Sequence, residues 1–264
     1  MLTLGFIGTG NMGGALAQAA AKNENNRLLL ANRHPEKAQR LREKIGGELT
    51  DSRSAAAKAD YIFLGVKPQM LETLFAEIRD TLSARTDRFV LVSMAAGTSI
   101  EKIRQLAGGD YPVIRIMPNT PVSIGEGMIL YACSKELRQE EKNAFLEAMA
   151  AAGRFSPLEE KLIDAGSAVS GCGPAFVDLF IEALADGGVA CGLPRAQALE
   201  YAAQMTAGSA RLILESGRHP GELKDAVCSP GGTTIQGVRT LEEAGFRAAV
   251  MNAVIAAYEK NFKL

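Results

Sequence analysis

The sequence has no tryptophan, only two histidines and only four cysteines among its 264 residues. The cysteines, at 133, 172, 191 and 228, lie far apart and form no C-x-x-C pair, which argues against a disulfide framework or a zinc site. The net charge is only −1, so the chain has no excess of positive charge to attract nucleic acid or an anionic membrane. We therefore predict free thiols, no metal and no nucleic-acid partner.

A secretion signal and a long uninterrupted apolar segment are also missing. The opening residues MLTLGFIGTG contain no basic segment and become glycine-rich before an apolar core could form. The most apolar later stretch, 174–193, is interrupted by Asp178, Glu182 and Asp186, so we expect no membrane span there. The composition, 47% hydrophobic and 22% charged, suits one or two soluble domains. These features predict a cytoplasmic protein without a membrane partner.

Up to residue 158, short apolar runs alternate with helical patterns. Because successive apolar residues indicate strands buried on both faces, this alternation predicts an α/β domain over 1–158, with a Rossmann-like, doubly wound parallel sheet. The expected strands are Leu2–Gly8, Arg27–Asn32, Tyr61–Val66, Phe89–Ala95, Val113–Met117 and Met128–Tyr131, and the expected helices lie near 12–22, 35–45, 69–80 and 99–106.

The remainder, 159–264, shows a different pattern. Strand signals stop after Pro157, and long segments rich in Ala, Leu and Glu follow at helical spacing. Glycine and proline interrupt them at 171–174, 192–194, 217–220 and 229–232. We predict an all-helical domain. Its many apolar faces and modest length favour a core completed by a second subunit, which makes this a dimerisation domain.

The segment GFIGTGNMGGAL carries the pattern G-x-G-x-x-G between an apolar strand and a helix. In this context the three glycines allow a tight turn, a close approach of the backbone to a pyrophosphate, and close packing of helix on strand. The free N–H groups at the start of the helix also favour phosphate. We therefore predict dinucleotide contacts at Gly8, Thr9, Gly10, Asn11, Met12 and Gly13.

The second strand, in RLLLANRHP, bears on the choice of cofactor. An NAD-binding protein would carry an acidic residue about 20 residues beyond the motif to bind the ribose hydroxyls. This sequence has Asn32 followed by Arg33, whose guanidinium can bind a 2′-phosphate. The residues favour NADP(H), with NAD(H) as the open alternative. Arg33 as a solvated loop cation is the simpler interpretation.

Two later strands end in short loops that we expect to face the same cofactor. Ligands of open α/β sheets bind at the carboxyl ends of the strands. The candidates are Val66, Lys67 and Pro68 in GVKPQ, and Ala95, Ala96 and Gly97 in SMAAG. Nothing nearby in the sequence would depress the pKa of Lys67, so a solvated or phosphate-contacting role is at least as plausible as a catalytic base. For Asn119–Thr120 in MPNTP, a stiff turn and a cleft-lining role remain open.

Three segments of the helical part, AVSGCGPAF, LKDAVCSPGGTTIQGV and LEEAGFRAAVMNAV, resemble the pyrroline-5-carboxylate reductase family. The resemblance extends over nearly the whole chain and includes GFIGTGNMGGAL, VKPQ and MPNTP. Cys172 is a departure, because the family usually has serine there, and this puts in doubt any role for a hydroxyl at that position.

This resemblance implies the NAD(P)H-dependent reduction of the cyclic imine 1-pyrroline-5-carboxylate to L-proline, the last step of proline biosynthesis. It also implies homodimers that assemble further, into rings such as decamers, and a place for Ser170 and Gly171 near the nicotinamide. It assigns the substrate carboxylate to one turn and puts the Thr234 hydroxyl, as the catalytic group, near the ring nitrogen. The expected substrate-binding residues are Ser229, Gly231, Gly232, Thr233 and Thr234. The alternative for this turn is a helix N-cap whose hydroxyls bond only their own backbone.

Two other functions fit parts of the sequence. A β-hydroxyacid dehydrogenase shares the glycine-rich opening, but it needs a lysine base in the interdomain helix, and 174–190 contains no lysine. A non-catalytic NADP sensor could use the same fold. It would have no use for a second anion site, which is what the turn at 229–234 suggests.

Overall fold

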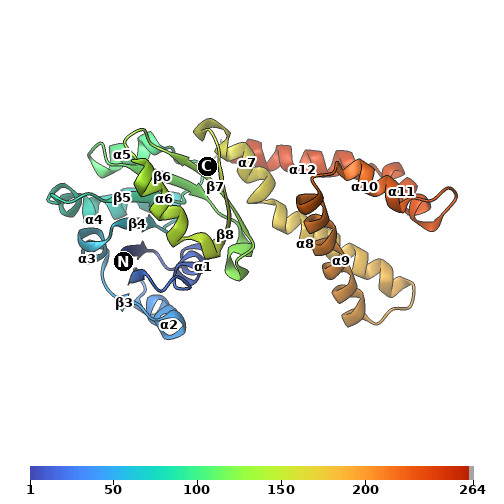
Figure 1. The fold of residues 1–264 in the computed structure, drawn as a ribbon, viewed down its shortest axis with the longest axis horizontal. Coiled ribbons are helices and arrows are strands. Elements are labelled where there is room, and N and C mark those ends of the chain that lie inside the picture. Colours follow the sequence, from blue (N-terminus) through green and yellow to red (C-terminus); the bar gives the residue numbers. More distant parts are fainter. Residues whose placement is uncertain (262–264) are drawn as a thin grey trace. The chain divides into compact units, whose positions relative to one another are not determined.

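A computed structural model describes residues 1–261 of the chain. The chain divides into two compact units. The first comprises Met1–Cys172 together with the segment that begins at Tyr258, and the second comprises Gly173–Ala257 (Figure 1). Each is described separately below.

The first unit is built on an eight-stranded sheet of order β3-β2-β1-β4-β5-β6-β7-β8. All neighbouring strands are parallel except β6 and β7, which are antiparallel. The link between those two holds only a short 3-10 turn, η2 (Thr120–Ile124), which is too short for the crossover that a parallel pair needs. The strands are β1 (Leu2–Ile7), β2 (Asn26–Ala31), β3 (Glu48–Leu49), β4 (Tyr61–Leu64), β5 (Val90–Ser93), β6 (Val113–Met117), β7 (Gly127–Cys133) and β8 (Gly153–Pro157).

Helices cover both faces of this sheet, so its strands are buried on both sides. Successive residues of β2 alternate between two cores: Leu28 and Leu30 pack with α1, α2 and α6, while Leu29 and Ala31 pack with α3, α4, α5 and α7. The helices of this unit are α1 (Asn11–Ala20), α2 (Pro35–Ile45), α3 (Ser52–Lys58), α4 (Leu71–Ser83), α5 (Ile100–Ala107), α6 (Gln139–Ala148) and α7 (Ile163–Ser170), with 3-10 turns η1 (Pro68–Met70), η3 (Ala150–Ala152) and η4 (Glu160–Leu162).

All six strands predicted from the sequence are present, and the predicted doubly wound α/β class is confirmed. The sequence patterns missed the short edge strand β3, the opposite edge strand β8, and helices α3 and α6.

The second unit is all-helical, as predicted. Its helices are α8 (Gly173–Ala190), α9 (Arg195–Ser216), α10 (Pro220–Val227), α11 (Thr233–Glu243) and α12 (Phe246–Asn261), the last of which ends in the first unit. Gly192, Gly217, Gly231 and Gly245, in the breaks between these helices, adopt positive φ angles that favour glycine.

The division between the units falls after Cys172, whereas the sequence pattern put it after residue 158. The difference is helix α7, because Ile163 and Ala168 on it are completely buried. Ile163 belongs to the core beneath β6 and β7, so α7 is part of the sheet unit even though its sequence reads as the start of the helical part.

The helical unit buries little of its own apolar surface. Its fully buried side chains are small ones, such as Ala185 and Ala198, and α12 has no buried residue. Within this unit, α8, α11 and α12 border an open groove of about 430 Å³, lined by Phe176, Leu179, Phe180, Ala183, Leu184, Leu241, Phe246, Ala249, Val250 and Ala253. The rings of Phe180 and Phe246 meet in it with centroids 5.9 Å apart.

One helical stretch, Glu160–Ala190, is long and apolar enough by length and composition to cross a membrane. We expected no such stretch. The sequence pattern treated Gly171–Pro174 as a break, whereas in the structure α7 and α8 follow each other with little interruption. Composition of this kind is also common in core helices. The complete burial of Ile163 and Ala168 shows that the first part of the stretch packs on protein.

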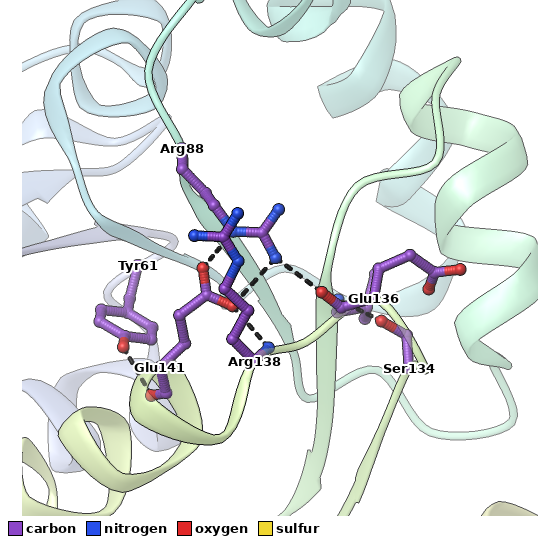
Figure 2. Close-up of polar contacts among 7 residues, drawn as sticks. Tyr61, Arg88, Ser134, Glu136, Arg138 and Glu141 are labelled. Atoms are coloured by element: carbon purple, nitrogen blue, oxygen red, sulfur yellow. Dashed lines mark hydrogen bonds and ion pairs between the residues drawn. The ribbon is translucent and has the colours of Figure 1, made fainter.

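A polar cluster lies at the amino ends of the parallel strands, where it stabilises the sheet (Figure 2). Arg88 forms an ion pair with Glu141 at the start of α6 and donates to the backbone carbonyl of Glu136, 2.6 Å away. The Tyr61 hydroxyl donates to the backbone carbonyl of Glu141 over 2.6 Å, and burial raises the Tyr61 pKa to about 12. Because ligands of such sheets bind at the opposite edge, we assign this cluster to stability rather than to chemistry.

Candidate nucleotide and substrate sites

The glycine-rich turn after β1 is held by direct backbone packing. Gly8 has φ +101°, and a β-carbon there would lie 2.5 Å from the carbonyl oxygen of Gly65. A β-carbon on Gly13 would lie 2.1 Å from the Gly8 oxygen, and one on Gly65 would lie 2.3 Å from it. These three glycines therefore let α1, β1 and the end of β4 approach one another. Gly65 was missed from the sequence, although it follows β4 just as Gly8 follows β1.

Gly10 serves a different purpose in the same turn. A β-carbon there would meet nothing within 4 Å, and its φ of −71° suits any residue. No side chain caps the first turn of α1, and the buried Thr9 hydroxyl has no hydrogen-bond partner among residues 1–261. Open space, free N–H groups at Asn11 and Met12, and an unpaired hydroxyl together fit the pyrophosphate of a dinucleotide.

The end of β2 is tied to this turn by Asn32. Its Oδ1 accepts a hydrogen bond from the Thr9 N–H at 3.0 Å, and its Nδ2 donates to the His34 carbonyl at 2.9 Å. Arg33, which lies between Asn32 and His34, is exposed. Its guanidinium makes no ion pair or hydrogen bond within the described part of the chain. A cation without a partner beside the nucleotide turn is suited to a 2′-phosphate.

The loops after β4 and β5 lie close to each other. A cavity of about 360 Å³ is lined by Pro68 from the first loop and by Gly97 from the second. Val66 and Ala96 are partly buried against the core, Ala95 is buried, and Gly97 turns with φ +65°. Lys67 is exposed. The glycine turn and these two loops follow the carboxyl ends of β1, β4 and β5, which are neighbours in the sheet, and this is the edge at which ligands of such sheets bind.

For Asn119, a stiff turn and a cleft-lining role were both open, and its hydrogen bonds support the structural role. Its side chain is 8% exposed, its Oδ1 accepts from the Met128 N–H at 2.9 Å, and its Nδ2 donates to the Ser170 carbonyl at 3.0 Å. It thus joins the start of β7 to the end of α7. The Ser170 hydroxyl donates to the Gly166 carbonyl of its own helix, and a β-carbon on Gly171 would lie 2.8 Å from the Ser167 carbonyl.

In the second unit, the turn 228–232 leads from α10 into α11. Gly231 has φ +68°, and Gly232 is the N-cap of α11 with no side chain hydrogen-bonded to the first turn. The hydroxyls of Ser229, Thr233 and Thr234 make no hydrogen bond within residues 1–261. The alternative of a hydroxyl N-cap is therefore wrong. The exposed turn presents free N–H and O–H donors and no ionisable side chain other than the Cys228 thiol.

A strand order of β3-β2-β1-β4-β5-β6, with a glycine turn at the β1/β4 switch point and an appended helical unit, defines a dinucleotide-binding protein of the Rossmann class. Two family models match the chain: "NADP oxidoreductase coenzyme F420-dependent" over residues 3–97, and "Pyrroline-5-carboxylate reductase dimerisation" over residues 160–264. The chain belongs to the pyrroline-5-carboxylate reductase family, because it is 40% identical over 99% of its length to a named member of that family.

Individual relatives cover the chain from end to end. It is 40% identical to the pyrroline-5-carboxylate reductase of Escherichia coli K12 over 99% of this chain and 97% of that protein. It is 39% identical to that of Glycine max over 99% and 96%. Among solved structures, that of Plasmodium falciparum pyrroline carboxylate reductase with NADP bound has a TM-score of 0.87, 32% identity, and coverage of 98% and 97%. That of the Streptococcus pyogenes reductase has a TM-score of 0.89, 31% identity, and coverage of 100% and 99%.

Proposed function

We propose that this protein reduces 1-pyrroline-5-carboxylate to L-proline with NADPH, the last step of proline biosynthesis. The observation that carries the proposal is the turn 228–232 together with the first residues of α11, where the hydroxyls of Ser229, Thr233 and Thr234 are free. It occurs in a chain 40% identical, over nearly its full length, to a named pyrroline-5-carboxylate reductase. A sensor that only binds the nucleotide would not need this second set of unpaired donors.

The substrate suits a site of this kind. It is a small ring with one carboxylate and one C=N bond. The carboxylate needs several converging donors, and the first N–H groups of α11 with the hydroxyls of Ser229 and Thr233 provide them. The Thr234 hydroxyl is assigned to the ring nitrogen, where it orients the C=N bond.

A reduced nicotinamide supplies the hydride when it is bound. The protonated imine already carries a positive charge, and hydride addition to the carbon of the C=N bond discharges it to a neutral amine. No alkoxide forms, so no strong general acid is required. The residues contribute by fixing the ring at near-attack distance and by excluding water. Ser170 and Gly171 are proposed as the wall beside the nicotinamide.

NADP(H) is the proposed cofactor, with NAD(H) as the alternative. The proposed contacts are those set out from the sequence: the glycine turn from Gly8 to Gly13 for the pyrophosphate, Arg33 for the 2′-phosphate, and the loops 66–68 and 95–97 for the nicotinamide side. The unpaired Arg33 and the open space at Gly10 support this assignment.

A homodimer formed through the helical unit is part of the proposal, as are further assembly to a decamer and a cytoplasmic location. The exposed apolar side chains on α8, α9 and α12 support the dimer, because apolar surface of this extent is rarely left open to water. Light scattering of the purified protein would give the number of subunits directly.

A spectrophotometric assay tests the reaction. The purified protein should oxidise NADPH only when 1-pyrroline-5-carboxylate is added, and chromatography should identify the product as L-proline. NADPH binding without any imine-dependent turnover would favour the sensor instead.

Thr234→Ala tests the proposed catalytic group. It should lower kcat while leaving the affinity for NADPH nearly unchanged, because the hydroxyl is assigned to the substrate. Thr240→Ala is the matched control on the same helix, since the Thr240 hydroxyl is already bonded to the Gln236 carbonyl at 3.1 Å. Equal losses of kcat and of NADPH affinity in Thr234→Ala would contradict the assignment.

A further inference from the structure

The two hydrogen bonds of Asn32 form a bridge between the loops that follow β1 and β2. The oxygen must face the Thr9 N–H at 3.0 Å, and the nitrogen must face the His34 carbonyl at 2.9 Å. A carboxylate has no donor for the carbonyl at neutral pH, and a serine hydroxyl is too short to reach both partners. This position therefore requires an amide, because an acidic residue could not make both hydrogen bonds.

The bridge fixes the short segment that carries Arg33. His34 is the N-cap of α2, and its carbonyl also accepts a hydrogen bond from the Lys37 N–H at 3.1 Å. Arg33 therefore lies between the end of a sheet strand and the start of a helix, with its backbone held on both sides. Its side chain is exposed and has no partner in the described residues.

We infer that Asn32 is a positioning residue that sets the preference for NADPH over NADH through Arg33. Each polar atom of its amide makes a hydrogen bond within the protein, and through these two bonds Asn32 holds the segment that carries Arg33 in place. This rests on the proposed use of a nicotinamide dinucleotide.

The size of the effect follows from the cost of ordering a loose residue. Without the bridge, the backbone that carries Arg33 must be ordered on binding, and a part of the roughly 1–2 kcal/mol that fixing the backbone of one residue costs corresponds to about 2- to 10-fold in affinity. That cost falls only on the ligand that Arg33 holds, the dinucleotide with a 2′-phosphate. If Asn32 merely stabilised the fold, its loss would weaken the binding of NADH and of NADPH equally, because the two cofactors differ only at the 2′ position of the adenosine ribose.

A mutant cycle on the full-length protein tests this, with the ratio of the NADH and NADPH dissociation constants as the readout. Cofactor fluorescence gives both constants for the wild type, Asn32→Ala, Arg33→Ala and the double variant. Asn32→Ala should lower the ratio by about 2- to 10-fold and Arg33→Ala by about 10- to 100-fold. The double variant should match Arg33→Ala to within about twofold, because without Arg33 the bridge has nothing to position.

Asn26→Ala is the matched control. Asn26 also bridges from β2, donating to the carbonyls of Ala20 and Ala148 at 2.8 and 2.9 Å, but from the opposite end of the strand. Its loss should leave the ratio unchanged. If Asn32→Ala does not fold, Asn32→Ser, which keeps a polar group, replaces it in the cycle.

An unchanged ratio in the Asn32 variant, or effects of the two substitutions that simply multiply, would overturn the inference. Binding requires no imine, so a wild type that binds NADPH but does not reduce the imine would count against the proposed reaction and not against the bridge.

Discussion

Replacing Gly10 with alanine should weaken dinucleotide binding while leaving the stability of the folded protein nearly unchanged. The three glycines of the turn differ in what an added methyl would meet. At Gly13 it would lie 2.1 Å from the Gly8 carbonyl oxygen, whereas at Gly10 it would meet no protein atom within 4 Å. The backbone at Gly10, with φ −71° and ψ −164°, also suits alanine. The methyl would therefore occupy only the space assigned to the pyrophosphate.

The magnitudes follow from these contacts. In the free protein, Gly10→Ala should be close to neutral, because the gain of about 0.4–1 kcal/mol from reducing the freedom of the unfolded chain is offset by the poorer suitability of alanine at the N-cap of α1. Placing a methyl where the ligand packs costs about 1–3 kcal/mol, equivalent to about 5- to 150-fold weaker binding. Gly13→Ala should instead cost about 1–3 kcal/mol of folding stability, a fall of several degrees in Tm.

Thermal unfolding of the free protein and NADPH titration by fluorescence separate these effects. Gly14→Ala is the control, since its methyl would make an ordinary 3.6 Å contact with the Thr9 carbonyl oxygen and favour the helix. It should be stable and bind NADPH. Wild-type affinity in Gly10→Ala would refute the placement of the pyrophosphate, and a fall in its Tm as large as that of Gly13→Ala would refute the packing argument.

Three further predictions concern other parts of the molecule. Arg33→Glu should weaken NADPH binding by about 10- to 100-fold with little change for NADH, measured by titration; an unchanged preference would refute the role of Arg33. Burial raises the pKa of Glu141, but hydrogen bonds from Arg88 and from the Arg138 backbone outweigh it and leave the pKa below its usual value. Glu141→Gln should therefore be less stable than wild type in neutral denaturant titrations. The difference should shrink as the pH falls below the pKa of about 4.3 of an unfolded glutamate, and it should vanish once the pH is also below the lowered folded-state pKa; a difference independent of pH would contradict this. Val250→Glu, in the apolar groove, should shift the assembly towards monomer in light scattering, and an intact dimer would place the interface elsewhere.

The sheet could be predicted where the sequence is apolar on successive positions. Strands such as β4 and β5 are buried on both faces, and no other structure hides four consecutive apolar residues so easily. Strand β8 lies at the edge, has no buried residue and ends in proline, so its sequence GRFSP gives no such signal. Helix α6 buries only Phe145 and Ala148, which is too few for a clear helical period.

Candidate site residues could be picked out from the sequence where residue type alone suggests the chemistry. The glycine pattern and the small hydroxyl residues before α11 could be found because few other roles require them together. The bridge made by Asn32 could not be found in this way, because its partners are a backbone N–H and a backbone carbonyl. Every residue at position 34 has a backbone carbonyl, and every residue except proline at position 9 has a backbone N–H. The residue types at these positions therefore give no sign of the bridge.

The starts of α1 and α11 share a feature that suits an anionic group. At the start of α1, the helix has no side-chain cap, Gly10 leaves open space and the Thr9 hydroxyl is unpaired. At the start of α11, the helix again has no side-chain cap, and the hydroxyls of Thr233 and Thr234 are free. A helix start usually recruits a side-chain oxygen as its cap, because unpaired N–H groups are costly when they are shielded from water. Leaving both starts uncapped gives up that stabilisation. The loss is offset if a phosphate or a carboxylate accepts hydrogen bonds from the free N–H groups and so serves as the cap. The proposed dinucleotide at the first start and the proposed imino acid at the second would supply one such group each, so the same argument would link cofactor and substrate to one chemistry.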